Sequence, residues 1–137
     1  WILNEAPLWK QILSRSSRVM VLMISRRNYT IRSMKLSDAK LKRLIEEATV
    51  DAYNESEQRV GFLTMIADNL ALPFATQILG VEVSVERVDL SAADAIVAIC
   101  RRGRTRQAIP ILELPLPRPA PRGAEWIEAY RRWMRGQ

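Results

Sequence analysis

Carboxylate side chains gather in one short stretch of this sequence. Between Arg43 and Arg59 there are five acidic residues and no basic one, which gives a local charge of −5 over fifteen positions. They are Glu46, Glu47, Asp51, Glu55 and Glu57. A hard cation such as Ca²⁺ takes six to eight oxygen ligands from carboxylates, amide oxygens and main-chain carbonyls. The residue types in this stretch therefore indicate binding of such a cation.

The predicted secondary structure places part of this acidic stretch near the end of a helix. Ser37 is typical of a helix N-cap, and apolar residues at three- and four-residue steps predict a helix over 38–52. Glu47 and Asp51 would then lie one turn apart on one face. Near the end of that helix, the dipole disfavours a carboxylate at Asp51 and the last carbonyls have no intrahelical partner. A bound cation would neutralise this carboxylate and give the carbonyls a partner.

The same residues also have a purely structural interpretation. Glu46 and Glu47 fit a solvated helix surface, and Asn54 with Glu57 three residues later has the form of a capping pair for a second helix. The spacing of the oxygen side chains does not match an EF-hand loop, which also has a central glycine.

Composition excludes several other kinds of chemistry. The chain has no histidine, which removes His-based acid–base catalysis and His-ligated metal sites. Its single cysteine, Cys100, lies in an apolar segment and is expected to be a buried hydrophobic side chain. We therefore expect no enzymatic activity, a cytosolic location and, for any bound ion, a preference for oxygen.

Two other polar clusters have simple interpretations. Asp89, Ser91 and Asp94 form a second oxygen-rich group, but these residue types are common turn formers. The arginines at 101, 102, 104 and 106 surround Gly103 in a predicted hairpin, where they could grip phosphates. They lack the interleaved aromatic residues of single-strand binders, so a solvated hairpin tip is expected.

The remaining pattern predicts helices on a small sheet. A second helix runs from Asn54 towards Pro73, and strands are predicted at 74–79, 81–86, 95–101 and 106–112. The proline-rich segment 115–121 is expected to be a stiff spacer. Residues 123–135 predict a terminal helix whose aromatic face, with Trp126, Tyr130 and Trp133, docks on the sheet. The fold class expected is α/β of the α+β kind, a compact sandwich of helices on a curled antiparallel sheet.

The basic charge of the chain sits mainly at its start. The formal charge is +6 in total, and residues 1–33 hold six basic side chains and one acidic one, a net of +5. The apolar run Val19–Ile24 is too short to span a membrane. We expect a basic extension at 1–33, with upstream or non-native sequence as one interpretation of it, and one domain at 34–137.

Several stretches from residue 34 onward follow one another in a recognisable order. They are Val50–Tyr53 with Glu55, Glu57 and Gln58, then Leu72–Ala75, Gly80–Val83, Val88–Leu90, Gly103–Arg104, Gln107–Leu114 and Glu125–Tyr130 with Trp133. In these stretches the sequence resembles the bacterial calcium-binding proteins of the CcbP type. The resemblance implies a compact α/β domain that binds Ca²⁺ reversibly through acidic surface groups and has no enzymatic activity. Asn54 and Ser56 stand where the family pattern is expected to be acidic, which implies weaker binding.

Taken together, the acid run and the resemblance predict a Ca²⁺ buffer or sensor. The predicted ligands are the carboxylates of Asp51, Glu55 and Glu57 and the neutral oxygen of Asn54. Two alternatives stay open: a basic-hairpin domain that binds nucleic acid or a protein partner, and a family member that has lost the ion. A nucleic acid is the less expected partner, and no membrane is expected.

Overall fold

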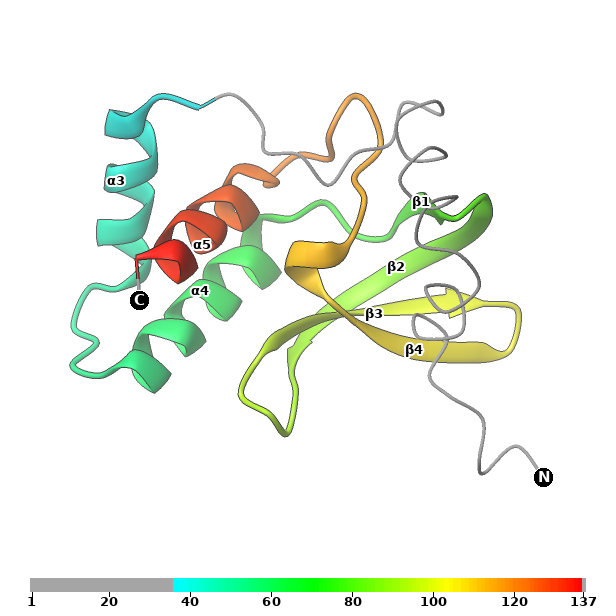
Figure 1. Ribbon diagram of the computed structural model, residues 1–137, viewed down its shortest axis with the longest axis horizontal. Helices are drawn as coiled ribbons and strands as arrows, with labels where there is room; N and C mark the ends of the chain where they lie inside the picture. The colour runs from blue at the N-terminus through cyan, green and yellow to red at the C-terminus, as the bar shows by residue number, and fades with distance from the viewer. Residues whose placement is uncertain (1–35, 137) are drawn as a thin grey trace.

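The computed structural model describes residues 36–136, and these form an α+β fold (Figure 1). In chain order the elements are α3 (Asp38–Ala48), α4 (Glu55–Asn69), β1 (Phe74–Ile78), β2 (Val81–Leu90), β3 (Ile96–Arg102), β4 (Thr105–Pro110), the short 3₁₀ helix η2 (Ile111–Glu113) and α5 (Glu125–Arg135). The expected fold class is confirmed: within this range, three α-helices accompany a four-stranded antiparallel sheet that is not closed. The expected boundary at residue 34 and the basic extension 1–33 lie outside the described residues.

Both helix starts are capped as the sequence predicts. The Ser37 side chain accepts a hydrogen bond from the Lys40 backbone N–H at 3.1 Å. The Asn54 carboxamide oxygen accepts one from the Glu57 N–H at 2.8 Å. Each cap satisfies a backbone donor that has no partner inside its helix. The two caps fix where α3 and α4 begin.

The end of α3 differs from the prediction of a helix over 38–52. The helix stops at Ala48, because the Thr49 hydroxyl donates to the Ile45 carbonyl at 2.8 Å and the chain then turns. Asp51 adopts a left-handed backbone conformation with a φ of 60°, which Asp tolerates better than most residues. The expectation that Glu47 and Asp51 share one helical face is therefore wrong. Asp51 belongs to a loop.

The sheet has the strand order β1-β2-β3-β4, so every strand pairs with its neighbour in sequence. Strand β2 extends to Leu90, beyond the predicted 81–86. A bulge falls between Val85 and Arg87 in its pairing with β3. The bulge shifts the alternation by one residue. Val83 and Val85 are buried before it, and Val88 and Leu90 pack against the core after it.

The hairpin between β3 and β4 is confirmed. Gly103 has a φ of 60° in the turn, a conformation that favours glycine. Strand β4 ends at Pro110 rather than at 112, and the chain continues into η2, where Ile111 is buried. The proline-rich segment that follows is more than a spacer, since Leu116 is buried and the Pro115 carbonyl accepts a hydrogen bond from Thr76 at 2.6 Å.

The three helices gather on one side of the sheet, and only α4 packs closely on it, against β2. Helix α5 packs mainly on α3 and α4 and also touches η2, whereas the sequence predicted that its aromatic face docks on the sheet (Figure 1). That face is nevertheless buried: Tyr130 and Trp133 lie against Phe62 of α4, with ring centroids 5.5 and 5.3 Å from it. Helix α4 is thus the central helix of the layer.

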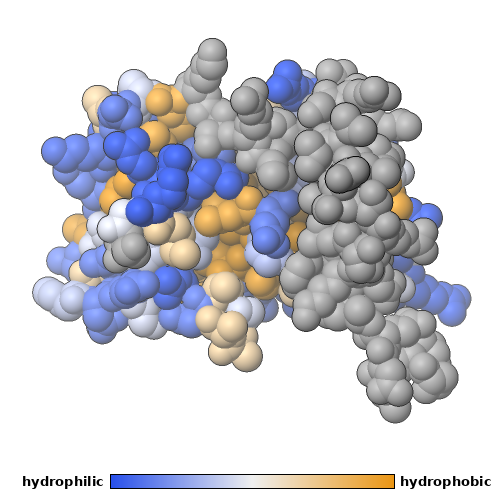
Figure 2. Space-filling view, in the orientation of Figure 1, coloured by the Kyte–Doolittle hydropathy of each residue, from blue (hydrophilic) through white to orange (hydrophobic). Residues whose placement is uncertain are grey.

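Figure 2 shows how polarity is distributed over one face of the molecule. Hydrophilic residues cover much of the helical side, and hydrophobic residues gather in the middle, where η2 lies between the helices and the sheet. Among the described residues, no helix has the length and hydropathy needed to cross a bilayer.

Helix α4 lies close to the end of α3 at Gly61. A Cβ atom built on Gly61 would collide with the backbone carbonyl of Ala48, which cannot move without shifting α3. We expect Gly61→Ala to lower the free energy of unfolding by about 1–3 kcal/mol, the usual effect of overpacking. Urea denaturation followed by circular dichroism measures this. Gly136→Ala is the control, because a Cβ there meets nothing closer than 3.5 Å; equal effects of the two substitutions would contradict the prediction.

Candidate calcium site

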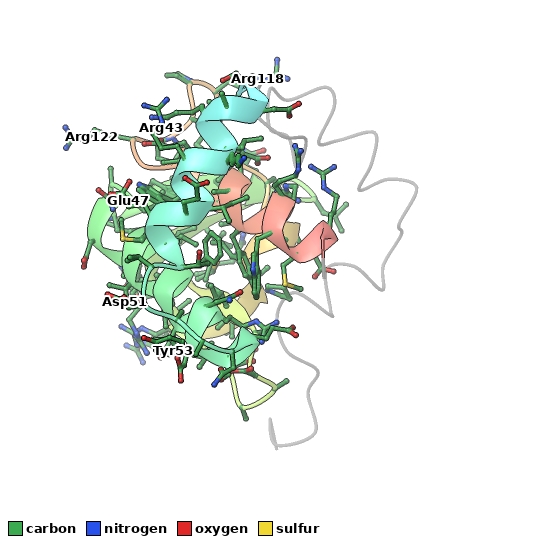
Figure 3. The ribbon with its side chains drawn as sticks, turned by 90° about the vertical axis from the view of Figure 1, so that its left-hand side faces the viewer. Arg43, Glu47, Asp51, Tyr53, Arg118 and Arg122 are labelled. Carbon is green, nitrogen blue, oxygen red and sulfur yellow. The ribbon has the colours of Figure 1, made fainter. Side chains whose placement is uncertain are left out.

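The predicted ligands lie in the loop between α3 and α4 and in the first turn of α4, and Asp51 is the one without a side-chain partner among the described residues. Its side chain is exposed, and it has no hydrogen-bond or ion-pair partner among residues 36–136. Figure 3 shows Glu47, Asp51 and Tyr53 following one another down the side on which α3 faces the viewer. Arg43, Arg118 and Arg122 are labelled towards the upper part of that view, away from Asp51. Asp51 is therefore free to bind a cation.

Asn54 and Glu57 are joined in a local hydrogen-bond network. Besides the cap at the Glu57 N–H, the Glu57 carboxylate accepts from the Tyr53 N–H at 2.8 Å and from the Asn54 side-chain amide at 3.1 Å. This is a capping arrangement in which both side chains satisfy donors at the start of α4. The structural interpretation of this pair is confirmed. All three donors are neutral, and all three lie at the surface.

Glu55 has a stronger partner. Its carboxylate accepts from Arg59, one turn later, at 3.0 Å. Arg59 also donates to Asp94 at 2.7 Å, although Asp94 lies in the loop between β2 and β3. One guanidinium thus links the first acidic cluster to the second.

Arg59 is held firmly. Only 11% of its side chain is exposed, and its guanidinium carbon lies 5.3 Å from the centroid of the Trp133 ring. Burial opposes the charged form, but hydrogen bonding to Glu55, Tyr130 and Asp94 outweighs it, so the pKa of Arg59 is raised above its ordinary value. Arg59 was not predicted from the sequence as part of the site, because its two partners come from different parts of the chain. Its spacing from Glu55, four residues along a helix, was the one available signal.

The predicted ligands are neighbours in sequence, but they are not assembled around one point. Within the part of the chain that the structure describes, no three acidic or cysteine side chains are grouped closely enough to hold a metal ion. A surface hollow of about 410 Å³ lies at the junction, and Asp51, Ser56 and Glu57 line it together with Val50 and Val60. Glu55 is not among its lining residues.

The second oxygen cluster has the expected structural role. The Asp89 carboxylate accepts from the Leu90 N–H, and the Ser91 hydroxyl accepts from the N–H groups of Ala93 and Ala95. Asp94 is paired with Arg59, as described above. These side chains shape the turn between β2 and β3.

The arginines of the hairpin are partly neutralised by a residue of the neighbouring strand. Glu86 accepts from Arg101 at 2.7 Å and from Arg106 at 2.8 Å, one with each carboxylate oxygen. These pairs reduce the positive charge available to phosphates at the hairpin.

Cys100, on the buried face of β3, is inaccessible as expected, and burial raises the pKa of its thiol to about 12.

The described domain therefore has an α+β fold with an exposed, oxygen-rich junction between its first two helices. A comparison with protein-family models gives a match to the CcbP-type family, described as calcium binding, over residues 42–134. The chain belongs to this family, and the matched region includes the whole α3–α4 junction. No curated protein and no solved structure matches the chain.

The donor chemistry at the junction fits the ion that the family name implies. Carboxylate and carboxamide oxygens and the exposed carbonyls of an irregular loop are ligands suited to Ca²⁺. The junction offers no histidine or cysteine, the ligands that zinc and copper prefer. The residues fit Ca²⁺ in their chemistry and accessibility, but they are not arranged around an ion. Asn54, Glu55 and Glu57 accept hydrogen bonds from protein donors in the described structure.

The cap at Asn54 makes a testable contribution to folding. We expect Asn54→Ala to lower the free energy of unfolding by about 1 kcal/mol, because the Glu57 N–H loses its acceptor. Thermal unfolding in calcium-free buffer measures the change. Ser56→Ala is the matched control, since Ser56 is exposed in the same helical turn. A destabilisation by Ser56→Ala as large as that of Asn54→Ala would argue against the cap.

The ion pairs of Glu86 predict a pH dependence of stability. The hydrogen bond from Arg106, and then that from Arg101, holds the pKa of Glu86 below its ordinary value despite partial desolvation. Glu86 therefore binds a proton more readily in the unfolded state than in the folded state. The ion pairs stabilise the fold above about pH 5, and this stabilisation is lost as the pH falls further. Glu86→Gln should lower the melting temperature at pH 7, and the difference from wild type should shrink towards pH 3. Glu82→Gln, on the same strand, controls for general effects of charge, and a difference that stays constant with pH would contradict the assignment.

Proposed function

We propose that this protein binds Ca²⁺ reversibly at the α3–α4 junction, as a calcium buffer or sensor in the cytoplasm, and that it is not an enzyme. The observation that supports the proposal is the match to the calcium-binding family across residues 42–134, a range that includes the oxygen-rich junction. The proposed ligands are Asp51, Asn54, Glu55 and Glu57, with loop carbonyls completing the set.

The present partners of each proposed ligand support an order in which the ligands would coordinate the ion. Asp51 is free to bind first, because it has no partner among residues 36–136. Glu57 is held by neutral donors, and its oxygens can accept a cation at the cost of weakening the cap. Glu55 is held by a charged donor and requires the largest exchange of partners.

Binding through so few carboxylates is expected to be weak. Fewer charged ligands and a less rigid site lower Ca²⁺ affinity, which puts the dissociation constant in the range of about 10⁻⁴ to 10⁻³ M. Such a value suits a buffer or sensor that responds to high local calcium. The surroundings of the junction include the strongly exposed side chains of Val50 and Tyr53, at 68% and 87%, which would be available to a protein partner of a sensor.

Isothermal calorimetry on the full chain tests the proposal. We expect saturable heat on titration with Ca²⁺ up to about 10 mM and a several-fold weaker affinity in Asp51→Asn, because one free carboxylate is lost. Asp68→Asn removes the same charge from an exposed position at the other end of α4 and should leave the affinity nearly unchanged. No saturable heat with the wild-type chain, or equal losses in the two variants, would rule out this site.

A further inference from the structure

Arg59 is the one cation that directly contacts a proposed calcium ligand in the described structure. Its two terminal nitrogens contact Glu55 at 3.0 Å and Asp94 at 2.7 Å, so it holds carboxylates from two separate segments. Those partners are much more exposed than Arg59 itself: their side chains are 55% and 43% accessible, against 11% for the arginine. The arginine is fixed, and the carboxylate of Glu55 has room to move.

Arg59 is also held by groups other than Glu55. Its guanidinium lies over the Trp133 ring, and one nitrogen is 3.8 Å from the Met134 sulfur. The indole N–H of Trp133 donates to Gln58 at 3.0 Å, which fixes the ring on which Arg59 lies. Because this geometry is already formed, the arginine loses little additional freedom when it pairs with Glu55.

Arg59 and a calcium ion would therefore compete for the same carboxylate. Coordination of a divalent ion by the Glu55 carboxylate would weaken its hydrogen bond from Arg59, and two cations at such separations repel each other. Glu57 has only neutral donors to give up, and Asp51 has none among the described residues. The Arg59–Glu55 pair is thus the strongest contact that calcium must displace.

We propose that Arg59 is a built-in competitor for calcium, which holds Glu55 in the ion-free protein and lowers the Ca²⁺ affinity of the α3–α4 junction. This inference rests on the proposed function, since it concerns the same site. When the ion binds, Glu55 rotates towards the junction, and Arg59 keeps its hydrogen bond to Asp94 and its place over Trp133. The arginine then sets the calcium concentration at which the site fills.

The central test compares Ca²⁺ dissociation constants of full-length variants by calorimetry. Arg59→Met keeps an unbranched apolar side chain against Trp133 but removes the charge, and it should tighten binding by a factor of three to ten, roughly the worth of a partly buried ion pair. Arg132→Met removes the same charge from a surface arginine that pairs with Asp38 instead. Arg132→Met should change the affinity less than twofold.

A double substitution separates direct competition from a general charge effect. In a Glu55→Gln background, Arg59→Met should bring no further gain, because the contested carboxylate is already gone. If Arg59→Met binds no tighter than Arg132→Met, or if its gain persists in the Glu55→Gln background, the inference is wrong while the proposed function stands. If neither wild type nor Arg59→Met binds Ca²⁺, the proposed function itself fails.

A second pair of variants covers the case in which Arg59→Met does not fold, which circular dichroism would show. Asp94→Asn removes the other partner of Arg59 and leaves its guanidinium to Glu55 alone, so Ca²⁺ binding should weaken about threefold or more. Asp89→Asn removes the same charge from the nearby end of β2, where the carboxylate contacts only the Leu90 N–H among the described residues. Equal effects of these two substitutions would overturn the inference.

Discussion

The contact between Phe62 of α4 and the aromatic face of α5 is the interaction on which the arrangement of the junction depends. Phe62 is fully buried, and its ring lies close to those of Tyr130 and Trp133. Burial of such a side chain contributes about 1.5–3 kcal/mol, and each aromatic pair adds about 0.5–1.5 kcal/mol. Since α4 also packs on α3 and on β2, this contact fixes where the start of α4 points. It also places Trp133 beneath Arg59.

The proposed ligands stabilise the protein in its ion-free state, and this couples calcium affinity to folding. Glu57 accepts donors that would otherwise lack partners at the start of α4, and Glu55 neutralises a largely buried arginine. An ion coordinated by these oxygens would be attracted by their negative charge. It would also weaken the hydrogen bonds of the helix cap and the ion pair between Arg59 and Glu55. The calcium affinity expected for the proposed site is the difference between this gain and this loss. Asp51, which has no partner among the described residues, would give the ion a carboxylate without this cost.

Local patterns in the sequence predicted local structure well. Caps at Ser37 and Asn54 and the turn at Gly103 follow from residue types at adjacent positions, and all are present. The end of α3 was missed because Ala52 continues the apolar period, whereas Thr49 and the left-handed Asp51 end the helix. The long β2 was missed because its bulge reverses the alternation in mid-strand. Contacts such as Arg59 with Asp94 join residues 35 positions apart, and no local period encodes them.

The irregular geometry of the junction bears on which hard cation it selects. Mg²⁺ demands near-octahedral ligands at short distances and gives up its water reluctantly, whereas Ca²⁺ accepts six to eight oxygens in flexible arrangements. Among residues 36–136, one carboxylate of the junction has no partner, a second is tied to a helix cap and a third is held by Arg59. Ligands that must be recruited one at a time cannot impose a tight octahedron. Such a set favours the larger ion, whose coordination shell tolerates carboxylates that arrive from different directions.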